Sequence, residues 1–269
     1  MAAGQLGNYR GRSFVEQEDV SYQRPIIIEI YAELFLEPGT FPFAQMLEVV
    51  PPLQRRGFGV VESADVAEAD LDGLEDPERR PAHVPRIRCW TEDRTRLVQL
   101  APDNVAMNLV SPEGTYPGWE PFVSDVVRPT CEILRQTASR ARPVSLALNT
   151  LDRFEIPRGL PLGEFLNCGG PRIPAILADT TQAFDYDIGR GLLESEGQNR
   201  QLHISGRPGA TAYLVNIHAV FHQTIPESGD ILLKLEQLHD DANTVFESLI
   251  TDRTRNEVMK GNVHAATSL

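Results

Sequence analysis

Residues 26 to 36 show the clearest alternation of hydrophobic and polar positions in the chain. The aliphatic side chains at one set of alternate positions are Ile28, Ile30, Ala32, Leu34 and Leu36. The positions between them hold Glu29, Tyr31, Glu33 and Phe35. Because successive side chains of a β-strand point to opposite faces, this pattern predicts a half-buried strand that begins after Pro25.

The hydrophobic spacing becomes helical between residues 43 and 53. The residues at intervals of three and four are Phe43, Met46, Leu47 and Val50. Pro51 and Pro52 are expected to stop this helix, because proline has no backbone N–H to donate. Residues 62–78 then carry eight acidic side chains and no basic one, which favours an exposed loop over an acidic docking site.

Three short strands are predicted next, at residues 86–91, 96–100 and 105–110, with turn-forming residues between them. They indicate an antiparallel meander. A helix is expected to open at Trp119 with Pro121 in its first turn, and Pro129 should kink it. The buried stripe of that helix should consist of Phe122, Val123, Val126, Ile133 and Leu134.

The second half follows the same plan of strands and then a helix. Strands are predicted at residues 144–150, near 201–205 and at 211–222, and a closing helix at about 229–259. Its hydrophobic stripe comprises Ile231, Leu235, Leu238, Ala242, Val245 and Leu249, widened by Leu232, Phe246 and Ile250. The width of this stripe favours a helix packed on its own sheet over a coiled-coil dimer seam.

These elements predict an α+β fold with two similar lobes, each an antiparallel sheet backed by a long helix. The expected organisation is a mobile N-terminal arm (1–24), a first lobe (25–142), a second lobe (143–262) and a C-terminal tail (263–269). Residues 157–175 are rich in Pro and Gly and should form a long irregular connection.

Composition narrows the classes of partner. The 269 residues carry 25 Lys plus Arg against 38 Asp plus Glu, a formal net charge of −13 that opposes binding to phosphate backbones and anionic lipid. No stretch approaches the roughly 18 apolar residues of a membrane span, and the first residues lack a secretory signal. The cysteines, Cys89, Cys131 and Cys168, form no C-x-x-C pair, which fits a reducing cytoplasm.

Several segments resemble a sporadically distributed bacterial family of uncharacterised proteins, from about Pro25 to Met259. The segments are VQLAPDNVAMNLV, YPGWEPF, an Asn-bearing strand and LEQLHDDANTVFESLITD. The matching residues are Gln99, Asp103, Asn108, Tyr116, Trp119, Phe122, Asn149, Leu238, His239, Phe246 and Thr251. Leu146 and Ala147 stand where family members often carry an Arg-Tyr pair. The resemblance implies a bacterial origin and a mobile-element or defence-related gene neighbourhood, and it implies no reaction.

No catalytic or cofactor motif is found. Cys168 in NCGG is expected to be a loop thiol, because no signature of a catalytic cysteine surrounds it. The glycines around Gly189 and Gly191 match neither a dinucleotide nor a P-loop motif. Asp185, Asp187, Asp240 and Asp241 match no metal motif, so no cofactor or metal is expected.

Two further groups were considered as binding sites. The arginines between residues 79 and 96 lie on both sides of Trp90 in the sequence and could stack with it on single-stranded nucleic acid. Local ion pairing with nearby acidic residues is favoured instead. His218 and His222 lie some 13 Å apart on one strand face, too far to share a metal, and His203 could lie on the neighbouring strand. A structural role beside Asn216 is favoured.

The predicted function is a non-catalytic interaction or regulatory protein that binds another bacterial protein, with no membrane contact and no direct nucleic-acid binding. The alternative is a small-ligand-binding protein or an unrecognised enzyme with a pocket between sheet and helix. Its speculative ligand-binding residues are Asn108, Asn149, Asn216 and His218, polar groups on otherwise apolar strands. A nucleic-acid mimic is a third, weaker hypothesis. Oligomeric state is not fixed by the sequence.

Overall fold

The computed structural model describes residues 26–67, 83–111, 116–157, 160–167, 184–188, 198–208, 212–225 and 230–259. The predicted arm, the tail, most of the acidic segment, Cys168 and the glycines near 190 lie outside the described residues. None of the helices in the described part is both long and apolar enough to cross a membrane.

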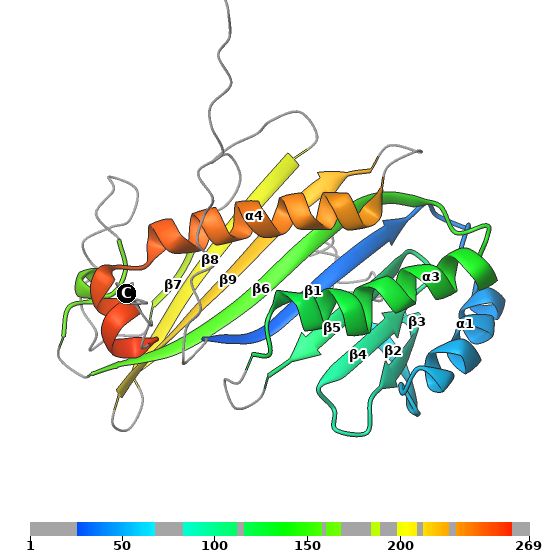
Figure 1. Ribbon diagram of the computed structural model, residues 1–269, viewed down its shortest axis with the longest axis horizontal. Coiled ribbons are helices and arrows are strands. Elements are labelled where there is room, and N and C mark those ends of the chain that lie inside the picture. Colours follow the sequence, from blue (N-terminus) through cyan, green and yellow to red (C-terminus); the bar gives the residue numbers. More distant parts are fainter. Residues whose placement is uncertain are drawn as a thin grey trace, which may run out of the picture.

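Nine strands of the described chain form one continuous antiparallel sheet (Figure 1). Those of the first half are β1 (Ile27–Leu36), β2 (Val60–Ala67), β3 (His83–Trp90), β4 (Arg96–Leu100) and β5 (Asn104–Val110). Those of the second half are β6 (Pro143–Pro157), β7 (Phe184–Ile188), β8 (Gln198–Pro208) and β9 (Ala212–Thr224). Their order across the sheet is β2-β3-β4-β5-β1-β6-β9-β8-β7, so the predicted α+β class and the meander β3-β4-β5 are confirmed.

The centre of the sheet is the antiparallel pair β1–β6, in which Ile30 lies opposite Thr150 and Tyr31 opposite Asn149. In each half the first strand is central and the last strand pairs with it, as β5 does with β1 and β9 with β6. The remaining strands extend outward in reverse order of sequence. The predicted arrangement of two separate sheets is therefore not seen, because the described strands form a single sheet in which the first strands of the two halves, β1 and β6, are paired.

One face of the sheet is apolar and carries the helices, and it is called the helix side below. The alternation predicted for β1 is confirmed, because Ile30, Ala32, Leu34 and Leu36 are buried and the residues between them only partly so. In the first half the helices are α1 (Phe43–Arg55), α2 (Trp119–Phe122) and α3 (Arg128–Thr137), with a π-helical turn η2 (Val123–Val127) between α2 and α3. In the second half α4 (Ile231–Leu249) crosses β6 and β9 (Figure 1).

Prolines disturb these helices less than expected. The first helix does not stop at Pro51 and Pro52 but continues to Arg55, and the side chain of Leu53 is fully buried beyond them. Two lost backbone hydrogen bonds near a helix end are offset by this burial. Pro129, where a kink is predicted, lies in the first turn of α3, directly after the π-helical turn η2. All five residues of the predicted stripe on this helix are buried.

The acidic segment is not a loop throughout, because residues 62–67 belong to β2 and pair with β3. Glu62 accepts a hydrogen bond from the indole of Trp90 (3.2 Å) and forms an ion pair with Arg94 (2.7 Å). Cross-strand partners of this kind allow an acidic residue to occupy a strand. Arg96 likewise pairs with Asp125 (2.9 Å), which agrees with local pairing of the arginine group.

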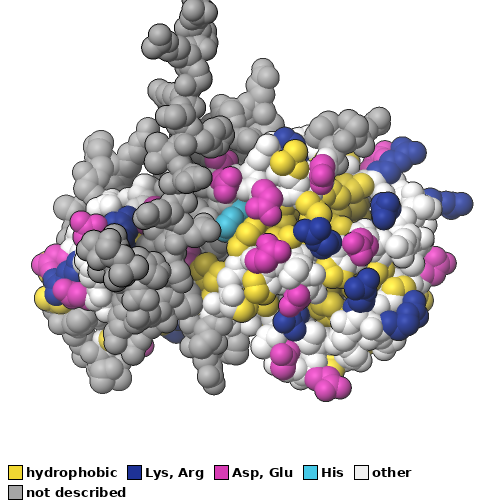
Figure 2. Space-filling model, viewed as in Figure 1, with side chains coloured by type: hydrophobic (Ala, Val, Ile, Leu, Met, Phe, Trp, Pro, Cys, Tyr) yellow, Lys and Arg dark blue, Asp and Glu magenta, His cyan; other side chains and the backbone are white. Residues whose placement is uncertain are grey.

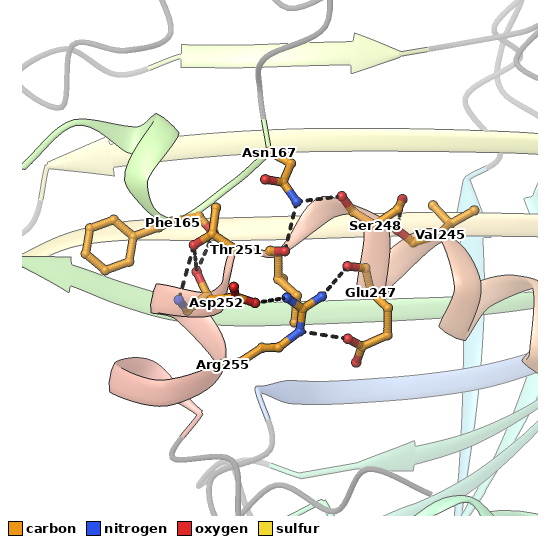
Figure 3. A network of polar contacts seen from close by, with 10 residues as sticks. Phe165, Asn167, Val245, Glu247, Ser248, Thr251, Asp252 and Arg255 are labelled. Carbon is orange, nitrogen blue, oxygen red and sulfur yellow. Dashed lines mark hydrogen bonds and ion pairs between the residues drawn. The ribbon is translucent and has the colours of Figure 1, made fainter. Parts of the chain in front are cut away.

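The closing helix is shorter than predicted. It ends at Leu249, Ile250 is extended and bridges to Leu166, and a separate π-helical turn η5 (Thr254–Val258) follows. Figure 3 shows the polar contacts that stabilise the chain between the end of α4 and η5. The amide of Asn167 donates to the carbonyl oxygens of Ser248 (2.9 Å) and Ile250 (3.0 Å), which the ended helix leaves without partners. Arg255 then joins Glu247 (3.0 Å) to Asp252 (2.9 Å).

Surface charge on the helix side is mixed. Figure 2 shows basic and acidic side chains interspersed there, with hydrophobic side chains gathered where α3 approaches the beginning of α4. Leu233, in the first turn of α4, is 57% exposed. The side seen in Figure 2 therefore does not present a uniform acidic surface of the kind a nucleic-acid mimic would need.

Leu238→Ala tests whether α4 is part of this core. Leu238 is 2% exposed beside buried Leu235 and Ala242, so its truncation should lower the free energy of unfolding by about 2–5 kcal/mol. The measurement is urea denaturation at two protein concentrations tenfold apart. Exposed Leu233→Ala on the same helix is the control and should change stability by less than about 0.5 kcal/mol. A midpoint that shifts with protein concentration would instead identify a dimer seam.

Candidate functional site

The side of the sheet opposite the helices is rich in polar groups, and we call it the polar face. It is the side that carries Tyr31, Asn108, Asn149, Asn216 and His218. Tyr31 of β1 lies between the two buried asparagines, opposite Asn108 on β5 and Asn149 on β6. Two strand spacings of about 4.8 Å separate the asparagines, so they are about 10 Å apart.

The second half contributes the other two predicted residues. His218 of β9 lies opposite Leu151, which makes it a diagonal neighbour of Asn149 at roughly 7–8 Å. Asn216 is farther along β9, opposite Arg153, whose Nε donates to its Oδ1 (2.8 Å). Asn108 and Asn149 therefore flank Tyr31 and His218 neighbours Asn149, whereas Asn216 is hydrogen-bonded to Arg153 farther along β9.

A chain of hydrogen bonds runs across four strands of this face. Arg88 Nε donates to Gln99 Oε1 (3.2 Å), Gln99 Nε2 donates to Asn108 Oδ1 (3.4 Å), and Asn108 Nδ2 donates to Glu29 Oε1 (2.8 Å). Asn104 Nδ2 similarly donates to Glu33 Oε1 (2.9 Å). Both atoms of the Asn108 amide thus have partners, as expected of a buried polar group.

Asn149 differs from Asn108 in this respect. Its side chain is 3% exposed, yet its Nδ2 has no hydrogen-bond partner among the described residues. Burying a donor without a partner costs about 1–3 kcal/mol. A hydrogen-bond acceptor from another molecule would therefore gain the most binding free energy at Asn149 on the polar face.

The groups around Asn149 combine donors with acidic acceptors. Burial, followed by the charges of Glu33 and Glu29, raises the pKa of Tyr31 to about 12, so Tyr31 remains a phenol that can donate. Burial raises the pKa of Glu33 and Arg86 partly opposes this. Burial and then the nearby His203 lower the pKa of His218, which keeps its imidazole neutral at pH 7. This arrangement suits a ligand with both acceptors and donors, and its carboxylates disfavour phosphate.

A second unusual group lies on the helix side of the same strand. Asp152 is 3% exposed, and it is the only ionisable side chain among the buried polar residues of the described chain. Burial raises its pKa to about 7, against a smaller opposing effect of a hydrogen bond with Thr150. Burial, followed by the charge of Asp152, also raises the pKa of Tyr116, whose hydroxyl is buried without a partner among the described residues.

Tyr116 lies between β5 and α2. Trp119, three residues later, stacks on His239 of α4 with ring centroids 3.8 Å apart and an interplanar angle of 3°. The indole of Trp119 also donates to Glu236 Oε2 (2.9 Å), and Asn243 contacts His239 Nε2 (3.2 Å). Tyr116, Trp119 and His239 are among the residues on which the family resemblance rests, and Trp119 and His239 form a contact between the two halves.

Sequence reasoning missed Asp152 and Tyr31 as site residues, whereas its placement of His203 on the strand beside His218 is confirmed. The predicted strand ended at Thr150, although the alternate positions Leu148, Thr150, Asp152, Phe154 and Ile156 continue its period of two. That continuation was the available signal for a buried acid. The described residues hold no group of three or more His, Cys, Asp or Glu that could bind a metal.

No protein-family model, curated protein or solved structure matches this chain.

Asp152→Asn tests the buried carboxyl through the pH dependence of stability. Asp152 ionises at about pH 3.9 when unfolded but near pH 7 when folded, so the unfolded chain loses this proton first and stability falls as pH rises between these values. Relative to wild type, Asp152→Asn should gain about 3 kcal/mol of stability between pH 5 and pH 8.

The measurement is urea denaturation of both proteins at each pH. The control is Asp240→Asn, at an exposed position on α4, whose difference from wild type should stay constant. Parallel curves for wild type and Asp152→Asn would show that the carboxyl ionises normally.

Proposed function

We propose that this protein is a non-catalytic interaction protein that binds a polypeptide partner through its polar face. The observation that carries the proposal is the buried amide of Asn149, which has a free donor beside the phenol of Tyr31. A polypeptide backbone supplies carbonyl oxygens for these donors and N–H groups for the carboxylates of Glu29 and Glu33. The same carboxylates and the net charge of −13 disfavour nucleic acid.

The raised pKa values of two cysteines support a non-catalytic role. Burial raises the pKa of Cys89 to about 11 and, with the charges of Glu132 and Asp230, that of Cys131 to about 12. Both remain thiols at neutral pH and are poor nucleophiles. The proposed setting is the bacterial cytoplasm, in a mobile-element or defence-related system, as the family resemblance and the widely spaced cysteines suggest.

We also propose that the two halves are related lobes, each a sheet backed by a long helix. Support comes from the strand order, which follows one rule in both halves. Outward from the centre of the sheet, the first half runs β1, β5, β4, β3, β2 and the second half runs β6, β9, β8, β7. A long helix follows the last strand of each half.

Asn149→Leu tests the polar face. Removing an unpaired buried amide should leave stability unchanged or raise it by about 1–3 kcal/mol, whereas loss of the donor should abolish binding. The assay is a quantitative affinity pull-down from source-cell lysate, with mass spectrometry of the captured partner and thermal unfolding measured separately. Asn243→Leu makes the same substitution on the exposed surface of α4 and should capture the partner as wild type does. Equal capture by Asn149→Leu would refute the proposal.

A second candidate function is small-ligand binding between the sheet and α4. Asp152 and Tyr116 favour it, because a buried acid and a phenol with a free hydroxyl could hold a polar ligand there. Native mass spectrometry of the purified chain separates the two functions. A small molecule that adds to wild type and is lost in Tyr116→Phe, with partner capture unaffected, would support ligand binding.

A further inference from the structure

The polar face also places two histidines at directly opposite positions of neighbouring strands. His203 of β8 is the cross-strand partner of His218 of β9. Directly opposite residues of an antiparallel pair have Cβ atoms about 4.5–5.5 Å apart, with side chains on the same face. Both histidines are partly buried, and the effect of the His203 charge on the pKa of His218 agrees with their closeness.

This spacing suits two ligands of one metal ion. Zn²⁺ binds imidazole nitrogen at about 2.0–2.1 Å, so two nitrogens of a tetrahedral site lie about 3.3 Å apart. Rings on opposed Cβ atoms can converge to that separation without any shift of the strands. Imidazole is also a good ligand for Cu²⁺ and Ni²⁺.

The surroundings carry a compensating charge. The carboxylate of Glu29 is close enough to affect the pKa of His218, and it would favour a bound cation. The neighbouring cation is Arg153, which donates a hydrogen bond to Asn216 (2.8 Å) in the adjacent cross-strand pair on this face.

We propose that His203 and His218 bind a divalent transition-metal ion of the Zn²⁺ type, with water completing its coordination. It is a two-histidine surface site, unlike a closed structural zinc site with four protein ligands. This proposal does not rest on the proposed polypeptide partner, since the histidine pair needs no second protein.

His222 provides a matched control on the same strand and face. It is also partly buried, but it lies opposite Ala147 on β6 and Asn199 on β8, and its ring meets Phe35 edge-on at 5.8 Å. It therefore has no histidine partner. His222→Ala removes an equivalent imidazole without touching the pair.

The test is titration of metal-free full chain with Zn²⁺, followed by calorimetry, and with Co²⁺, followed by its visible spectrum. Wild type should bind one equivalent and unfold at a higher temperature with Zn²⁺ present. His203→Ala and His218→Ala should each weaken binding at least tenfold, and His222→Ala should remain within twofold of wild type. Circular dichroism verifies that each variant is folded.

Absence of binding by wild type at millimolar Zn²⁺ would overturn the proposal. Equal weakening by His222→Ala would do so too, because it would indicate non-specific binding to surface imidazoles. Partner capture, measured separately with the Asn149→Leu variant, is unaffected by either result.

Discussion

The antiparallel pairing of β1 with β6 is the constraint on which the rest of the structure depends. It fixes Tyr31 opposite Asn149 and thereby joins two groups of strands into one sheet. The side-chain period of a strand is two, so a slip of one residue in this pair would turn over every side chain of β6. Asn149 would then point to the helices and Asp152 away from them. The register therefore decides which polar group lies on which side.

Burial on the helix side explains why this register is held. Leu146, Leu148, Phe154 and Ile156 of β6 all enter the core, together with alternate residues of β9 such as Val215. A slip would exchange them for the residues between them, which include Ser145, Asn149, Arg153 and Glu155, at about 1.5–3 kcal/mol for each large aliphatic side chain exposed. The free-energy cost of burying the Asp152 carboxyl is small compared with the cost of exposing these side chains. The stack of Trp119 on His239 adds a further contact between the halves.

Much of this fold follows from the hydrophobic pattern alone. The alternation in residues 26–36, the meander of β3 to β5 and the buried stripe after Trp119 were predictable because each is a local pattern that the core then reinforces. The strand β2 was not, because its acidic residue Glu62 is stabilised by Trp90 and Arg94, more than 25 positions away. The end of α4 at Leu249 depends equally on a distant residue, Asn167, which accounts for the overlong predicted helix.

The candidate site was predictable only in part, for the same reason. A polar residue on an apolar strand identified Asn108, Asn149 and His218, but the sequence could not distinguish the paired amide of Asn108 from the unpaired one of Asn149. That difference arises from Gln99 and Glu29 on neighbouring strands. The grouping itself needs both halves, since Tyr31 comes from the first and Asn149 from the second. Neither half alone could present it, so a partner bound as proposed would contact both halves at the β1–β6 junction and would require the whole sheet to be folded.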